Sequence, residues 1–190
     1  MPSSKKKQGL TEERVNALPL FESGWSAAAR QDAKRRLLDT GLPTRRDEYW
    51  KYTRPDKLAA VVALPSVPHQ DIESPIFDSL DCIKIVFIDG IFSRELSDDL
   101  HVAGASLELI SDTKDVDQHW AKDLYGTLER SGQTPVARPL AALNSAYAVD
   151  GILLNVEESM SKPLSVHYVH SSETSDVMLH HIIKMKEGAS

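Results

Sequence analysis

Three short apolar segments near the end of the chain constrain its fold more than any other feature. Residues 152–156, 164–169 and 177–185 are rich in aliphatic and β-branched side chains, and polar turns separate them. The segments begin at intervals of about a dozen residues, a spacing typical of a sandwich, a barrel or the successive coils of a β-helix. The sequence therefore predicts a β-rich C-terminal part and leaves these three architectures open.

The N-terminal part of the chain predicts helices instead. A short helix is expected from Thr11, which can cap it, to the residues before Pro19. A second helix follows Ser26, a suitable N-cap, and Gly41 marks its end. Short capped helices of this kind predict a small helical region at the start of the protein.

Between these two parts the sequence predicts a linker, a hairpin and two more helices. Prolines within residues 61–79 disfavour helix and central strand, so this stretch predicts a linker. Asp89 and Gly90 separate two apolar runs and predict a β-hairpin, because glycine tolerates positive φ. Apolar spacing predicts one amphipathic helix over residues 111–129 and another helix, packed by one face, over residues 139–149.

Length and charge narrow the class of protein. With 190 residues the chain can form one domain, or a small helical region attached to a larger one. No apolar run approaches the roughly 20 residues of a membrane span, so we expect no membrane partner and a cytoplasmic location. The formal net charge of -6 argues against a nucleic-acid partner, since such surfaces need clustered cations.

Cations nevertheless gather in one part of this acidic chain. They are Lys34, Arg35, Arg36, Arg45 and Arg46. A solvated helix face and loop explains them, and the alternative is a surface for an acidic partner.

The residues that could ligate a metal are few. Cys82 is the only cysteine, so it cannot supply the several thiolates that a zinc or iron-sulfur site takes. His167 and His170 are three residues apart, His180 and His181 are adjacent, and odd separations on a strand point to opposite faces. His167 can still face His181 across neighbouring strands, but two ligands do not complete a site. We therefore assign no catalytic, cofactor-binding or metal-binding residue, and predict structural or surface roles for the histidines.

Two other groups suggest chemistry at first sight. Tyr49, Trp50 and Tyr52 could form a stacking platform for a ligand, but aromatic clusters more often plug the gap between a helix and a core. Asp89 and Asp150 each precede a glycine at a predicted turn, where turn formation is the usual role of Asp. Both groups are predicted to be structural.

Four blocks of the sequence resemble one known family. PTRRDEYWKYT (43–53) resembles a motif near the N-terminus of the SufD-type proteins of the SufB/SufD family. ALNSAYAVDGILLNV (142–156) and HHIIKMKEGAS (180–190) resemble the beginning of the core that this family shares. IVFIDGIF (85–92) resembles its strand, Asp-Gly, strand unit, so the resemblance covers the chain from about residue 40 to its end.

The resemblance implies a mixed α and β fold, in which an N-terminal helical region precedes the start of a right-handed parallel β-helix. It also implies a scaffold subunit, not an enzyme, in the SUF system of iron-sulfur cluster assembly. Its partners in the SufBCD complex would be a SufB-like subunit and a SufC-like ABC ATPase. The full complex would handle the cluster, and no cofactor is expected in this chain.

The predicted organisation follows from these observations. It comprises a disordered tail (1–10), an N-terminal helical region (11–60), a Pro-rich linker (61–79), a hairpin plus an amphipathic helix (80–135) and the first coils of the β-helix (136–190). The family continues beyond the Glu-Gly-Ala signature at residues 187–189, so the β-helix is expected to be truncated here. An open β edge of this kind predicts self-association.

Two other functions remain as alternatives. One is a β-helix enzyme that acts on polysaccharides, and the other is an interaction adaptor unrelated to iron. Polysaccharide-cleaving grooves need several Asp, Lys and Arg residues, whereas the predicted strands from 152 to 185 carry Lys184 and no carboxylate. The strand composition therefore favours the scaffold.

Overall fold

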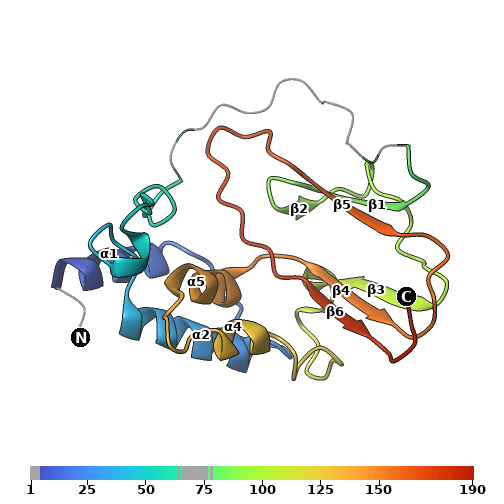
Figure 1. The fold of residues 1–190 in the computed structure, drawn as a ribbon, viewed down its shortest axis with the longest axis horizontal. Helices are drawn as coiled ribbons and strands as arrows, with labels where there is room; N and C mark the ends of the chain where they lie inside the picture. The colour runs from blue at the N-terminus through green and yellow to red at the C-terminus, as the bar shows by residue number, and fades with distance from the viewer. Residues whose placement is uncertain (1–4, 64, 66–76, 78) are drawn as a thin grey trace. The chain divides into compact units, whose positions relative to one another are not determined.

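The computed structural model describes residues 5–63, 65, 77 and 79–190, and the chain forms two compact units (Figure 1). The first unit comprises residues 1–64 and 114–148, and the second comprises residues 65–113 and 149–190. Each unit is thus built from two separate stretches of the sequence. The predicted linker at 61–79 lies largely outside the described residues.

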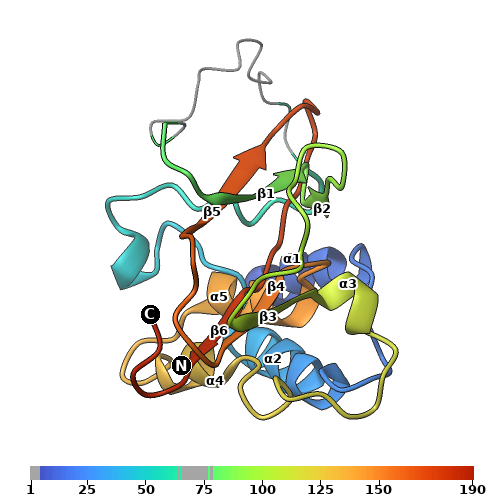
Figure 2. The same ribbon diagram turned by 90° about the vertical axis from the view of Figure 1, so that its right-hand side faces the viewer.

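The first unit is helical. It contains α1 (Lys5–Asn16), α2 (Ala27–Thr40), the 3₁₀ turn η1 (Glu48–Trp50), α4 (Thr127–Ser131) and α5 (Pro139–Tyr147). Helices α2 and α5 lie side by side in both views (Figures 1 and 2) and form the main contact between elements of this unit. Both helices contribute fully buried side chains to that contact, because α2 is rich in alanine and leucine and α5 carries an apolar face.

The ends of α2 agree with the sequence, whereas the start of α1 does not. That helix begins at Lys5, so Thr11 lies inside it and is not an N-cap. The buried Thr11 hydroxyl donates to the carbonyl oxygen of Lys7 at 2.7 Å and accepts from the backbone N–H of Leu42 at 2.9 Å. Gly41 ends α2 as predicted, with φ 73° and its N–H donated to Leu37.

The single amphipathic helix predicted over residues 111–129 is wrong. The structure has two short helices, α3 (Ile110–Thr113) and α4, joined by turns. Val116 is 44% exposed and its carbonyl oxygen accepts from the Trp25 N–H, while Leu128 is 87% exposed. Three aspartates and Gly126 also lower helix propensity between the short helices. The helix predicted from Pro139 is confirmed as α5.

The second unit contains two small sheets. One has the strand order β2-β1-β5, with β1 (Ile83–Ile88), β2 (Ile91–Phe92) and β5 (Leu164–Val169). The other has the order β3-β4-β6, with β3 (Ala105–Leu109), β4 (Ile152–Val156) and β6 (Ile182–Met185). The β1–β2 and β3–β4 pairs are antiparallel, and the β1–β5 and β4–β6 pairs are parallel.

The hairpin is confirmed as the antiparallel β1–β2 pair. Its two turn residues have positive φ, 48° at Asp89 and 85° at Gly90. This combination is the signature of the tight turn that the Asp-Gly dipeptide favours.

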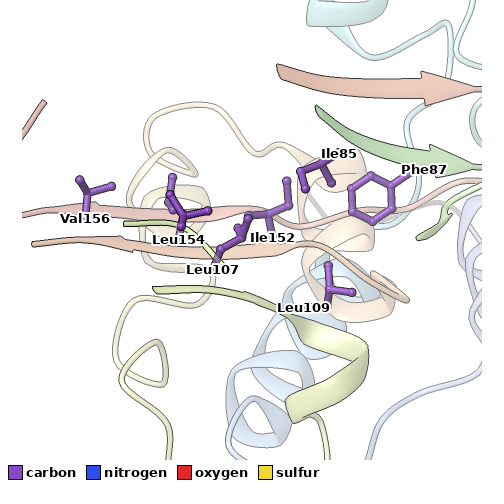
Figure 3. Close-up of a cluster of buried hydrophobic side chains, with 8 residues drawn as sticks. Ile85, Phe87, Leu107, Leu109, Ile152, Leu154 and Val156 are labelled. Carbon is purple, nitrogen blue, oxygen red and sulfur yellow. The ribbon is translucent and has the colours of Figure 1, made fainter. Parts of the chain in front are cut away.

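The hydrophobic core of the second unit lies between the two sheets (Figure 3). Side chains from β1, β3 and β4 point toward one another. Successive side chains of a strand point to opposite faces of its sheet, so every second residue of these strands enters the core. The buried members of this core are Ile85, Phe87, Val102, Leu107, Leu109, Ile152, Leu154 and Val156.

The three C-terminal strands follow a coiled path. The chain runs along β4 in one sheet, crosses to β5 in the other sheet, and returns as β6 to pair in parallel with β4. The first two strands have the predicted bounds, while the third begins at Ile182 and not at Val177. The described residues thus form a mixed α and β fold with two small open sheets, and no closed sheet is present among them.

Candidate functional site

The strands β5 and β6 each lie at one end of their sheet. Tyr168 on β5 is 51% exposed, and Ile183 and Met185 on β6 are 62% and 53% exposed. Ile183 pairs with Leu154 and Met185 with Val156, so both share the register of core residues in β4. Each of these edge strands thus presents exposed apolar side chains that a further strand can cover.

His181 occupies a defined position between these strands. Its Nδ1 accepts a hydrogen bond from the backbone N–H of Ile152 at 2.9 Å, and its Nε2 lies 2.9 Å from the hydroxyl oxygen of Tyr168. Because Nδ1 accepts, the neutral ring carries its proton on Nε2 and donates it to Tyr168. Burial lowers the pKa of His181.

The unfolding free energy should therefore depend on the protonation of His181. Its folded pKa lies below the unfolded value of about 6.5, so its contribution is complete above that pH and is lost as the pH falls toward the folded pKa. We expect His181→Gln to flatten this acid-side fall in stability, as measured by urea unfolding between about pH 7.5 and 5. His170→Gln is the matched control, since His170 is exposed and its Nδ1 lies 3.2 Å from the Ser175 hydroxyl. An unchanged slope in His181→Gln would assign the pH dependence to another group.

His167 has a local partner. His167 Nε2 lies 2.8 Å from the hydroxyl of Ser165, and Tyr168 takes the position opposite His181 that His167 was expected to reach. Cys82 is half-buried and is not in a disulfide. Among residues 5–63, 65, 77 and 79–190, no group of three His, Cys, Asp or Glu side chains is arranged to hold a metal ion.

The two Asp-Gly aspartates hold loops in place. The Asp89 carboxylate accepts from the Ser171 hydroxyl at 2.5 Å and from the N–H groups of Ser171 and Ser172, and these bonds lower its pKa. Asp150 is 5% exposed and accepts from the N–H and hydroxyl of Ser111. Burial raises the pKa of Asp150 despite these bonds.

The aromatic segment does not form the buried plug that its composition suggested. Tyr49 is 70% exposed and Tyr52 is 91% exposed, while Trp50 is half-buried. The cause is local, since η1 is a single 3₁₀ turn and consecutive side chains on such a turn point in different directions. Only one aromatic residue of this turn can face the fold.

Trp50 and Tyr49 line a pocket of about 190 Å³ in the helical unit. Its opposite lining comes from Pro135, Val136 and Pro139, which precede and open α5. Residues 49–50 and residues 135–139 are far apart in the sequence, so local sequence patterns did not reveal the pocket that they form together.

The basic residues fall into two groups. Arg36 makes two hydrogen bonds with the Glu129 carboxylate, at 2.6 and 2.9 Å, and Arg35 pairs with Asp32. The cations of α2 are therefore largely neutralised within the fold. Arg45 and Arg46 are exposed, and neither makes an ion pair with a residue that the structure describes.

Comparisons with known proteins add one finding. No family model matches the chain. The chain is similar to the iron-sulfur cluster assembly protein SufD of Escherichia coli (strain K12), with 24% identity over 175 residues. The alignment covers 83% of this chain, and the chain spans about 39% of the length of that relative. No helix in the described part of the chain is long and apolar enough to cross a membrane.

Proposed function

We propose that this chain is a SufD-type scaffold subunit of iron-sulfur cluster assembly and has no catalytic activity of its own. The observation that carries this proposal is the similarity to SufD over 83% of the chain. The four sequence blocks that resemble the SufB/SufD family, from residue 43 to residue 190, support the same assignment.

The strand path supports a β-helix as the architecture behind this function. The chain passes from β4 to β5 in the other sheet and then returns as β6, which pairs in parallel with β4. Successive coils of a β-helix stack in the same way, each strand pairing in parallel with the corresponding strand of the coil before it. In this proposal the exposed edges of β5 and β6 receive a following coil. Where no coil covers them, the same edges are where two copies would associate.

The proposed partners are a SufB-like subunit and a SufC-like ABC ATPase in a cytoplasmic complex. The cluster belongs to that complex, because Cys82 is the only thiol of the chain and clusters usually take four protein ligands. The chain therefore contributes surfaces for assembly, and cluster chemistry is supplied elsewhere.

Co-purification tests this assignment. The tagged chain is expressed together with the SufB-type and SufC-type proteins of its own organism, and the purified material is analysed by light scattering and iron content. We expect a complex of fixed stoichiometry that holds iron after anaerobic reconstitution, while the chain alone does not.

Cys82→Ser is the control, and it should leave both complex formation and iron content unchanged. Failure to capture either partner would refute the assembly role. A stoichiometric cluster on the isolated chain that is lost in Cys82→Ser would show that the chain holds a cluster itself.

A further inference from the structure

We propose that the pocket lined by Trp50 is a docking site for an acidic segment of a partner protein that inserts one apolar side chain. The site lies wholly within the helical unit. The inference is independent of the proposed function, since it uses only the geometry and charge of this unit.

The pocket has the size of a single side chain. Its volume is about 190 Å³, whereas pockets for drug-sized ligands measure about 300–1,000 Å³. Trp50, Tyr49, Pro135, Val136 and Pro139 supply an apolar lining. Lys7 and Asp47 also line the pocket and are paired with each other, so the apolar part of the lining suits an aliphatic or aromatic anchor.

Hydrogen bonds fix one wall of the pocket in advance. The Asp47 carboxylate, which belongs to the lining, accepts from the Thr44 N–H at 2.7 Å and from the Lys7 ammonium at 3.1 Å. These bonds tie the turn before η1 to helix α1. A wall that is already ordered does not have to be ordered on binding, and this raises affinity for a ligand of the right shape.

The surface beside the pocket is basic although the whole chain is acidic. Residues 44–58 contain five Lys and Arg against three Asp and Glu, and one of those carboxylates, Asp47, is already paired with Lys7. Within the described part of the chain, Arg45, Arg46 and Arg54 make no ion pair. These cations are thus available to carboxylates from outside.

Exposed aromatic rings complete the surface. Tyr49 and Tyr52 are 70% and 91% exposed, and the Lys51 ammonium lies 5.4 Å from the centre of the Tyr52 ring. Tyr, Trp and Arg are the residues enriched at the energetic centres of protein interfaces. Large exposed rings rimmed by charges are therefore typical of a protein-binding surface.

The number of cations selects a peptide over other anions. Polybasic membrane sites use about 4–8 clustered cations, and a DNA-binding protein contacts about 6–10 phosphates. Residues 44–58 contain five cations, but three carboxylates are interspersed with them, so the net excess is two. A mixed segment of this kind suits a few carboxylates around one anchor better than an extended anionic surface.

Fluorescence anisotropy with a defined probe tests the proposal on the full chain. The probe is a labelled synthetic peptide of Asp and Glu residues around one central Leu. We expect Arg45→Glu/Arg46→Glu to weaken binding by at least about tenfold, because the peptide then meets like charges. Replacing the central Leu of the peptide by Ser should weaken binding by about three- to tenfold.

The matched control is Lys122→Glu/Arg130→Glu, which changes the net charge equally at exposed positions of the same unit. This control should change the affinity for the peptide less than about twofold, because salt screens the attraction between the peptide and charges far from the pocket. Equal losses in both double variants, or equal binding of the Leu and Ser peptides, would overturn the proposal. The proposal would also be overturned if the peptide did not bind, or if the chain bound a single-stranded oligonucleotide or phosphatidylserine vesicles more tightly than the peptide. Circular dichroism checks that each variant is folded.

Discussion

Replacing Gly151 by alanine is expected to lower the free energy of unfolding by about 3 kcal/mol, a large share of the roughly 5–15 kcal/mol that stabilises a domain. A Cβ at this position would lie 1.9 Å from the carbonyl oxygen of His180 and 2.6 Å from its carbonyl carbon. Both atoms belong to the backbone, so no side chain can move aside to relieve the clash.

Hydrogen bonds on both sides of the contact hold the backbone of residues 151 and 180 in place, so the backbone cannot shift without losing them. The His180 N–H donates to the Asp150 carbonyl oxygen at 3.0 Å, and the Ile110 N–H donates to Gly151 at 2.9 Å. Moving the backbone at residue 151 or at residue 180 would break the hydrogen bonds at the start of the parallel pair of β4 and β6. Urea unfolding at constant pH measures the difference between variant and wild type.

Gly9→Ala is the matched control for this substitution. Gly9 lies inside α1, and a Cβ there would meet no atom within 4 Å. Alanine favours helix more than glycine does, so this change should stabilise the protein by about 0.5–1 kcal/mol. A Gly151→Ala variant as stable as wild type would mean that residues 151 and 180 are not in such close contact.

Replacing Arg30 by methionine is expected to cost about 2–4 kcal/mol. Arg30 on α2 is fully buried, and its Nη1 donates to the carbonyl oxygens of Ala146 and Ala148 at 3.3 and 2.7 Å. Its Nε donates to the hydroxyl of Ser26 at 2.9 Å. Methionine is similar in length but offers no donor, so the buried carbonyl oxygens of Ala146 and Ala148 at the end of α5 would lose the hydrogen bonds from Arg30.

Ring contacts add to this effect. The guanidinium carbon lies 4.8 Å from the centre of the Phe21 ring and 4.9 Å from that of Tyr125. Burial lowers the pKa of Arg30, and burial likewise raises the pKa of Tyr125 to about 12. A planar cation between two rings gains an attraction that an aliphatic chain cannot replace.

Arg35→Met is the control, because this side chain is 65% exposed on the same helix. Exposed ion pairs contribute little, so the variant should unfold within about 0.5 kcal/mol of wild type. If Arg30→Met is equally harmless, the buried guanidinium does not hold α2 against α5.

Local chemistry made much of the fold predictable. The Asp89-Gly90 turn, the bounds of β4 and β5, and the end of α2 at Gly41 each depend on neighbouring residues alone. The length of β6 and the single helix over 111–129 were wrong because long-range backbone partners, such as Trp25 with Val116, decide those segments.

Arg30 was missed as a structural residue although a signal existed. Arg30, Ala33 and Leu37 follow helical spacing and are all buried, so the arginine lies on the apolar face of α2. The sequence around it contains several cations, and this spacing separates Arg30 from Arg35, which lies outside the series and is exposed. The pocket at Trp50 was beyond prediction, since its second wall comes from residues 135–139, far away in the sequence.

The pairing of α2 with α5 also imposes a time order on synthesis. Arg30 and Ala146 are 116 positions apart, and a ribosome adding about 5–20 residues per second needs about 6–23 s to cover that distance. Helix α2 is therefore complete long before its partner exists, and the stretch that intervenes includes β1, β2 and β3 of the other unit. The helical unit therefore cannot close until α5 has left the ribosome.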